Sequence, residues 1–223
     1  GEKLEGKKVA ISGFGNVSWG TALKLNELGA KVITISGPDG YIYDPDGVSG
    51  DKVDYLLELR ASGKNICSPY AEKYPNAKFY AGKKPWEVDA DLYIPCATQN
   101  EIREEDAKSF VERGVKFVCE GSNMSSTNEA IKIMQDGGII VGPSKAANAG
   151  GVACSCIEMG QNAGKTVFTP EQGHAQLKDI VVGIHDACKD AAEKYGFGYN
   201  LVAGANIAGF LKVADAMMAQ GIC

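Results

Sequence analysis

Apolar segments alternate with amphipathic ones along the first two thirds of the chain. Apolar and β-branched runs predict six strands, at residues 8–12, 31–36, 78–80, 91–94, 115–119 and 139–141. Between these runs, apolar positions spaced by three or four residues predict helices, as over 49–61, 104–113 and 127–135. This regular alternation with short links predicts an α/β fold. We expect a doubly wound, mostly parallel Rossmann-type sheet with helices on both faces.

After residue 141 the pattern changes, and only helices are predicted. Thr169 and Gln172 fit a capping box with Pro170 at the first helical position, which opens a helix that extends to Lys194. A glycine-rich segment ends that helix, and residues 205–220 carry a last apolar stripe. We therefore expect a Rossmann-type domain over residues 1–200 and a C-terminal helical extension over residues 201–223.

Composition and charge exclude several classes of protein. The 223 residues carry a formal net charge of −5 with no long basic run, so no nucleic-acid partner is expected. The uncharged segment 146–157 is shorter than the roughly 20 apolar residues that span a bilayer, so no membrane partner is expected. The chain opens with Gly1 and its first strand follows at once, which is typical of a piece of a longer protein.

Cysteine usage bears on compartment and metal binding. The seven cysteines are an odd number and mostly lie in apolar runs, which favours reduced thiols in a cytoplasmic protein. Cys154 and Cys156 have no second Cys or His pair at a spacing typical of metal ligands, so no metal site is predicted.

A glycine-rich turn separates the first predicted strand from the first predicted helix. Gly13-Phe-Gly-Asn-Val-Ser18 matches G-x-G-x-x-G/A, except that serine stands at the third small position. Gly13 permits a tight turn, Gly15 leaves room for a pyrophosphate, and Ser18 is small enough for close packing of helix on sheet. A helix that begins near Asn16 directs its free N–H groups at the phosphates. In this strand–turn–helix context, the motif predicts dinucleotide binding.

The segment after the second strand leaves the choice between NAD and NADP open. Ser36-Gly-Pro-Asp39 stands where an NAD site usually has an acidic residue at the strand end, about 20 residues after the glycine motif. Ser36 and the neighbouring N–H groups suit a 2′-phosphate, but no arginine is adjacent in the sequence. Asp39 suits either a ribose hydroxyl or a role in capping the turn.

Three further segments that follow predicted strands are rich in small and amide residues. They are Pro95–Asn100, Glu120–Met124 and Gly142–Val152. Ligands of open α/β sheets bind beyond the carboxyl ends of the strands, so we expect these segments and the glycine turn to form one site. Amide side chains suit a carboxamide such as nicotinamide, because they supply donors and acceptors without charge. Lys145, which lies in the third segment, is interpreted as structural or cofactor-proximal.

Together these segments resemble the cofactor domain of glutamate dehydrogenase, in the Glu/Leu/Phe/Val dehydrogenase family. The resemblance rests on Gly13–Val17, Ser36–Ile42, Lys84–Trp86, Pro95–Asn100, Asn148–Val152 and Gly204–Phe210. It implies an oxidoreductase for the reversible NAD(P)-dependent oxidative deamination of L-glutamate to 2-oxoglutarate and ammonia. It also implies a Rossmann fold with one reversed strand and a homo-hexameric parent enzyme.

The same resemblance assigns roles to individual residues. It implies that the coenzyme is bound by Gly13, Gly15, Asn16, Val17, Ser36, Gly37, Asp39, Ala97, Thr98, Gln99, Asn123 and Asn148. Val152 and Ser155 match positions that touch the glutamate substrate, in a segment expected to be a loop. Cys156 stands where the family usually has glycine, which bears on the packing of that loop.

The resemblance places the catalytic lysines and aspartate in a preceding substrate domain that this chain lacks. We therefore expect no catalytic residue here, weak NAD(P) binding and no turnover of glutamate by the chain alone. The last helix is expected to return toward the missing domain. The alternatives are a dehydrogenase for leucine, phenylalanine or valine, a stand-alone NAD(P)-sensing module, and a nucleotide-sugar or methyl-donor enzyme on the same fold. The sequence does not determine coenzyme preference, oligomeric state of this chain, regulation or the dominant direction of reaction.

Overall fold

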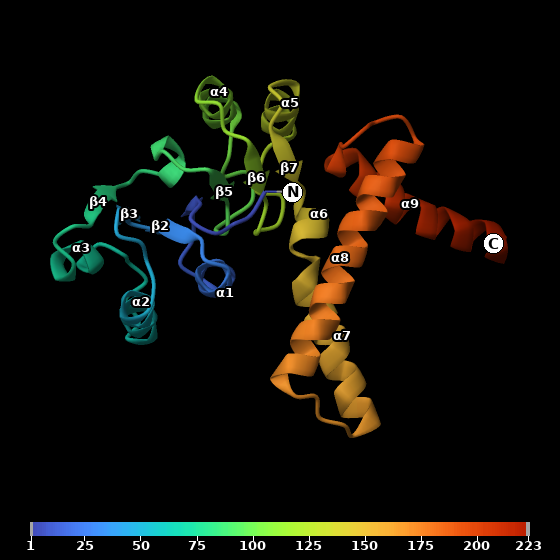
Figure 1. Cartoon of the computed structure of the whole chain (residues 1–223), viewed down its shortest axis with the longest axis horizontal. Helices are drawn as coiled ribbons and strands as arrows, with labels where there is room; N and C mark the ends of the chain where they lie inside the picture. The colour runs from blue at the N-terminus through green and yellow to red at the C-terminus, as the bar shows by residue number, and fades with distance from the viewer. Residues whose placement is uncertain (1, 222–223) are drawn as a thin grey trace. The chain divides into compact units, whose positions relative to one another are not determined.

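The computed structural model describes residues 2–221, which form two compact units, one up to Ile140 and the other from Val141 on. Figure 1 shows a sheet with helices in the first unit and a group of helices in the second. The sequence-based boundary after residue 200 is a different one, because it separates off a last helix that is expected to return to another domain. That boundary stays a prediction.

The first unit is built on a mostly parallel sheet. The sheet has seven strands in the order β4-β3-β2-β1-β5-β6-β7, and the last of them, β7, begins at Ile140 and continues into the second unit. Its strands are β1 (Lys8–Ile11), β2 (Lys31–Gly37), β3 (Gly40–Tyr43), β4 (Lys78–Ala81), β5 (Leu92–Ile94), β6 (Phe117–Cys119) and β7 (Ile140–Gly142). The pairs β1–β2, β1–β5 and β5–β6 are parallel, and β3 is antiparallel to both β2 and β4. The expected α/β class is confirmed.

The seventh strand, β3, is absent from the sequence-based prediction of six strands. Only Pro38 and Asp39 separate β2 from β3, and Gly37 pairs with Gly40 across this turn. A connection of two residues joins only antiparallel strands, because parallel neighbours require a long crossover. β3 has only four residues and begins with the last glycine of the Gly-Pro-Asp-Gly turn, so the hydrophobic pattern does not reveal it. β3 is the reversed strand that the family resemblance implies.

Helices cover both faces of this sheet. They are α1 (Asn16–Glu27), α2 (Asp51–Ala61), α3 (Pro69–Lys73), α4 (Glu104–Glu112) and α5 (Asn128–Asp136), with a short 3₁₀ helix η1 (Pro85–Glu87). Figure 1 shows α1 and α2 on one side of the sheet, with α4 and α5 on the other. Apolar side chains of β1, β2 and β3 pack against α1 and α2 in a core that includes Val9, Ile35, Ile42 and Leu56. This burial fixes the strand ends that carry the candidate site.

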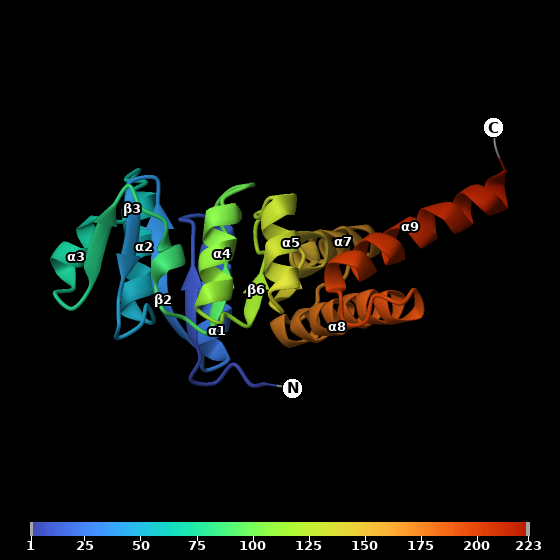
Figure 2. The same ribbon diagram turned by 90° about the horizontal axis from the view of Figure 1, so that it is seen from above.

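The second unit consists mainly of helices. They are α6 (Ser144–Ala147), α7 (Ala149–Gly164), α8 (Pro170–Lys194) and α9 (Leu201–Gln220). Figure 2 shows α7 and α9 beside α8. A Cβ on Gly204 of α9 would lie 1.8 Å from the carbonyl oxygen of Cys188 in α8, so the two helices meet where only glycine fits. The Oδ1 atom of Asn200 accepts from the Ala203 amide and caps α9, which begins at Leu201, four residues before the expected start at residue 205.

By length and composition alone, α9 is apolar enough to cross a membrane. That is weak evidence, and α9 carries Lys212 and Asp215 within its length. The expectation that the protein has no membrane partner stays a prediction.

Candidate functional site

The glycine turn has the shape that its sequence predicts. Gly13 has a φ of +95°, and a Cβ there would lie 2.6 Å from the carbonyl oxygen of Cys96, so a side chain is excluded. A Cβ on Gly15, by contrast, would meet no atom within 4 Å, which leaves open space beside the backbone. Helix α1 begins at the next residue, Asn16, and the first amides of a helix lack intrahelical acceptors. Open space at a helix N-terminus fits a bound phosphate.

Ser18 does more than pack closely against the sheet. Its buried Oγ accepts from the Gly15 amide and also lies 3.0 Å from the Gly15 carbonyl oxygen. The hydroxyl therefore closes the first turn of α1 and occupies the Gly15 N–H. Asn16 and Val17 are exposed and offer the next amides of the turn to a ligand.

Ser36 and Asp39, the expected ribose-side residues, are both held by backbone amides. The Gly13 amide donates to Ser36 Oγ over 2.8 Å, which links the end of β2 to the glycine turn. The carboxylate of Asp39 accepts from the amides of Cys67 and Ser68 at 3.0 and 2.9 Å. Burial would raise the pKa of Asp39, but these donors outweigh it and hold the pKa below 3.8. Of the two interpretations of Asp39, this geometry favours the capping role.

Arg60 also reaches the glycine turn, although it lies 46 residues from it along the chain. Its guanidinium donates from the last turn of α2 to the carbonyl oxygen of Phe14 and, at 3.4 Å, to Asn65 Oδ1. The turn therefore has a positive charge beside it, a favourable setting for an anion. Sequence reasoning missed Arg60, because nothing in a solvated helix end signals a contact with a distant loop.

Three of the four expected loops meet at the carboxyl ends of β1, β5 and β6. The Cys96 amide donates to Ser12 Oγ over 2.9 Å, and the amides of Gly121 and Ser122 donate to the Pro95 carbonyl oxygen. Four residues predicted to face nicotinamide are exposed on these loops, namely Ala97, Thr98, Gln99 and Asn123. Parallel neighbouring strands bring these loops together, as the sequence predicts.

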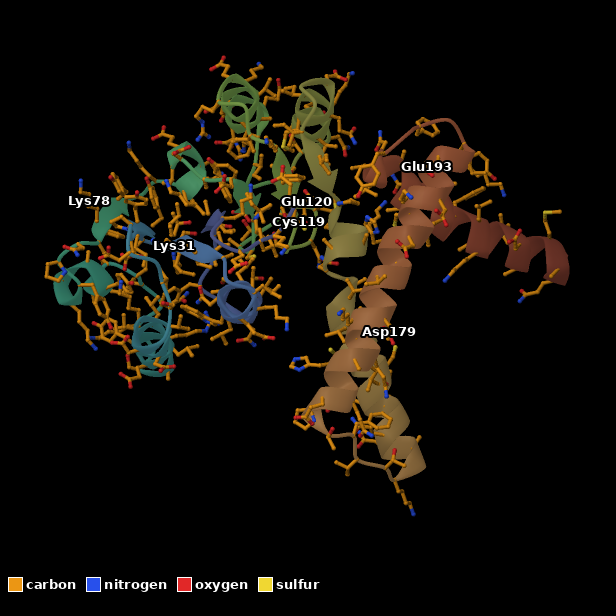
Figure 3. All side chains as sticks on the ribbon, in the orientation of Figure 1. Lys31, Lys78, Cys119, Glu120, Asp179 and Glu193 are labelled. Atoms are coloured by element: carbon orange, nitrogen blue, oxygen red, sulfur yellow. The ribbon has the colours of Figure 1, made fainter. Side chains whose placement is uncertain are left out.

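Buried carboxylates brace two of these loops from within. Figure 3 labels Cys119, the last residue of β6, and Glu120, which follows it. The Ser126 amide donates to Glu120 over 2.7 Å, and this bond closes the loop that carries Asn123. Glu101, only 6% exposed, accepts from the Ala97 and Thr98 amides at 3.0 and 3.3 Å. Burial raises the pKa of Glu101 despite these donors. Sequence reasoning missed Glu101, because a glutamate in a polar turn is usually exposed.

The expected residues of the second unit lie on helices. The prediction of a loop at Val152 and Ser155 is wrong, because both belong to α7. Small residues dominate the start of α7, so it lacks the apolar periodicity that announces a helix. Val152 and Ser155 are three residues apart, share one helix face and are exposed. Cys156 is exposed as well, so it does not disturb internal packing.

Two further residues of this unit stand near helix ends. Asn148 is half-buried and forms the junction of α6 with α7. Lys145 Nζ donates to Asn206 Oδ1 over 2.5 Å and so joins α6 to α9. This bond supports the structural interpretation of Lys145.

Among residues 2–221, no group of three or more His, Cys, Asp and Glu side chains is arranged to hold a metal ion. Six cysteines in that range are free thiols. The seventh, Cys223, lies outside the described residues.

Comparison with known proteins adds a family to this geometry. Residues 1–221 match the family described as Glutamate/Leucine/Phenylalanine/Valine dehydrogenase. An NAD-specific glutamate dehydrogenase of Bacteroides fragilis is 56% identical over 223 residues, which are 100% of this chain and 50% of that protein. An NADP-specific glutamate dehydrogenase of Giardia intestinalis is 47% identical and matches 98% of this chain and 49% of that protein.

A solved structure is also similar to this chain. A glutamate dehydrogenase matches 100% of this chain and 50% of its own, with a TM-score of 0.95 and 53% identity. The chain thus spans about half the length of the curated relatives that it matches.

Proposed function

Because this chain belongs to the Glutamate/Leucine/Phenylalanine/Valine dehydrogenase family, we propose that it is the coenzyme-binding part of an NAD(P)-dependent glutamate dehydrogenase. The reaction would be the reversible oxidative deamination of L-glutamate to 2-oxoglutarate and ammonia. The observation that carries the proposal is the open space at Gly15, which lies beside the helix N-terminus that begins at Asn16.

The residues present fit such a coenzyme. The amides of Asn16 and Val17 would bind the pyrophosphate, with Gly13 and Gly15 shaping the cradle around it. Ser36, Gly37 and Asp39 would border the adenosine ribose from the neighbouring strand end. Thr98, Gln99 and Asn123 would orient the nicotinamide carboxamide through hydroxyl and side-chain amide groups, and Ala97 would lie beside them. Asn148, in the second unit, is the remaining residue that the family resemblance implies for coenzyme binding.

When bound, oxidised NAD(P) would accept the hydride that leaves the α-carbon of the amino acid. On the substrate side, the helix face with Val152 and Ser155 would contact L-glutamate or 2-oxoglutarate. Amino-acid dehydrogenation also needs a general base and cations for two carboxylates. We infer that the general base and these cations come from a substrate domain, which corresponds to the half of the relatives that this chain does not match. We also infer that the complete enzyme is a homo-hexamer of the cytoplasm.

Titration calorimetry with NADH and NADPH in separate experiments tests the proposal. We expect saturable one-site binding of at least one of them, abolished or much weakened in Gly15→Ala. A strong preference for NADPH would assign Ser36 to phosphate recognition, whereas equal affinities would indicate dual use. Absence of binding by either nucleotide at millimolar concentration would contradict the proposal.

An activity assay separates the coenzyme-binding part from a complete enzyme. We expect no glutamate-dependent formation of NADH or NADPH by the 223-residue chain, because the general base lies elsewhere. Sustained turnover by the purified chain would contradict that expectation. Turnover with leucine, phenylalanine or valine would favour the other branches of the family.

A further inference from the structure

We propose that Glu101 is a positioning residue for the nicotinamide end of the coenzyme, a role that rests on the function proposed above. Glu101 directly follows the exposed segment Ala97–Asn100, yet its own side chain is buried. It would act through the backbone of that segment and would not touch the coenzyme itself.

The carboxylate of Glu101 connects the ends of three neighbouring strands. Its Oε1 atom accepts from the amides of Ala97 and Thr98, which follow β5. The Ser12 hydroxyl, at the end of β1, also hydrogen-bonds this carboxylate, while Ser12 Oγ accepts from the Cys96 amide over 2.9 Å. On the β6 side, Ser122 Oγ lies 3.5 Å from Oε1. One side chain thus links the loops that follow the carboxyl ends of β1, β5 and β6.

A carboxylate suits this position because it only accepts hydrogen bonds. The Ala97 and Thr98 amides both point at it, and bonds to a charged acceptor are about twice as strong as neutral ones. A buried acid is costly unless its partners are in place. Lys84 donates its Nζ to the Glu101 carbonyl oxygen over 2.5 Å and keeps a positive charge close by.

The buried carboxylate of Glu101 therefore holds the backbone of the exposed segment Ala97–Asn100 in place. Ala97 and Thr98 are tied by their amides to the interior, while both residues and Gln99 remain exposed. A loop that is already ordered loses little conformational entropy when a ligand binds, so the affinity for that ligand rises. The benefit falls on the part of the coenzyme that touches this loop, the nicotinamide ring, and not on the ADP-ribose part.

Comparison of NADH with ADP-ribose isolates this effect, because ADP-ribose lacks the nicotinamide. Binding of both ligands is measured by calorimetry for the wild type, Glu101→Ala and Glu101→Gln. Loss of a buried acceptor for two amides predicts NADH binding weaker by about tenfold in E101A, with ADP-ribose changed by less than about twofold. E101Q keeps one acceptor oxygen, so its NADH affinity should lie between those of the wild type and E101A.

Asp44→Asn is the matched control. Asp44 is a fully buried carboxylate of the same unit that binds Tyr70 and Lys52, far along the chain from the nicotinamide-side loops. Its replacement should lower the melting temperature without changing the ratio of NADH to ADP-ribose affinity. If E101A does not fold, E101Q decides through faster amide hydrogen exchange at Ala97 and Thr98 together with weaker NADH binding.

The outcomes that overturn the proposal differ from those that overturn the function. Equal weakening of both ligands in the Glu101 variants would show a general structural role, and unchanged NADH affinity would show no role. Failure of the wild type to bind either ligand would refute the proposed function, and this proposal with it.

Discussion

Asn100 donates its backbone N–H to the carbonyl oxygen of Met124 over 2.8 Å, and both residues adopt left-handed backbone conformations, with φ of 55° and 48°. Elsewhere in residues 2–221, Lys165 is the one other non-glycine residue with positive φ. Each such conformation costs about 1–2 kcal/mol for an L-residue. The hydrogen bond thus joins two strained residues, one from each of two nicotinamide-side loops. Strained backbone conformations of this kind cluster at binding sites.

The strain at Asn100 predicts that glycine is tolerated there better than alanine. We expect Asn100→Gly to be more stable than Asn100→Ala by about 1 kcal/mol in urea unfolding, because only glycine adopts positive φ without cost. The same pair at Lys108, an exposed position within α4, should show the opposite order by about 1 kcal/mol. Equal stability of the two variants at position 100 would argue against strain.

The two glycines of the turn should respond differently to alanine. Gly13→Ala combines a positive φ with a clash against the Cys96 carbonyl, so we expect a loss of about 2–4 kcal/mol in unfolding free energy. Gly15→Ala meets open space and should cost at most about 1 kcal/mol, typical of alanine at a helix N-cap. Its NADH affinity should nevertheless fall by about tenfold or more. Unchanged NADH binding by G15A would place the pyrophosphate elsewhere.

Ser36→Ala tests how the serine at the end of β2 acts. Because Ser36 Oγ accepts from the Gly13 amide, its removal leaves that buried amide unpaired and should cost about 1–3 kcal/mol of stability. The same change disturbs the pyrophosphate turn, so NADH and NADPH should weaken by similar factors in calorimetry. A loss confined to NADPH would instead show a direct bond from Ser36 to the 2′-phosphate.

Asp39 predicts a loss of stability in acid. Its pKa is below 3.8 in the folded protein, because the Cys67 and Ser68 amides outweigh the effect of burial. The folded state therefore binds a proton less readily than the unfolded chain does, and the stabilisation is present above pH 3.8 and lost as the pH falls through the folded pKa. The stability difference between the wild type and Asp39→Asn, measured by urea unfolding, should shrink over that window. A pH-independent difference would contradict the assignment.

Glu101 predicts a dependence of the opposite sign. Burial raises its pKa above 4.5, with the Lys84 charge and the hydrogen bonds of Ser12, Ala97 and Thr98 acting in the other direction. The folded state then binds the proton more tightly, so stability falls as the pH rises from 4.5 through the raised folded pKa. Glu101→Gln should gain stability relative to the wild type across this range, whatever the constant offset between them. A stability difference between Glu101→Gln and the wild type that does not change with pH would show that burial does not raise the pKa of Glu101.

The sequence by itself determined the local features of the protein. A β-branched run, two glycines and a helix start specify the turn at Gly13–Ser18, since each depends on a few neighbouring residues. The same holds for the order of the strands and helices before residue 141, except for β3. Six short segments, of which Pro95–Asn100 and Asn148–Val152 are the most specific, together pointed to the family that the comparison then showed.

Only the tertiary structure decided which groups meet across long separations in sequence. It turned Gly40–Tyr43 into a reversed strand, placed Val152 and Ser155 on a helix, brought Arg60 to Phe14 and occupied Asp39 with the amides of Cys67 and Ser68. It also buried Glu101 behind the loop that precedes it. Hydrophobic periodicity shows which face of each helix or strand packs against a core, because it depends only on neighbouring residues. The hydrogen-bond partner of a polar side chain, by contrast, depends on which distant segments pack together, and the local pattern does not specify that.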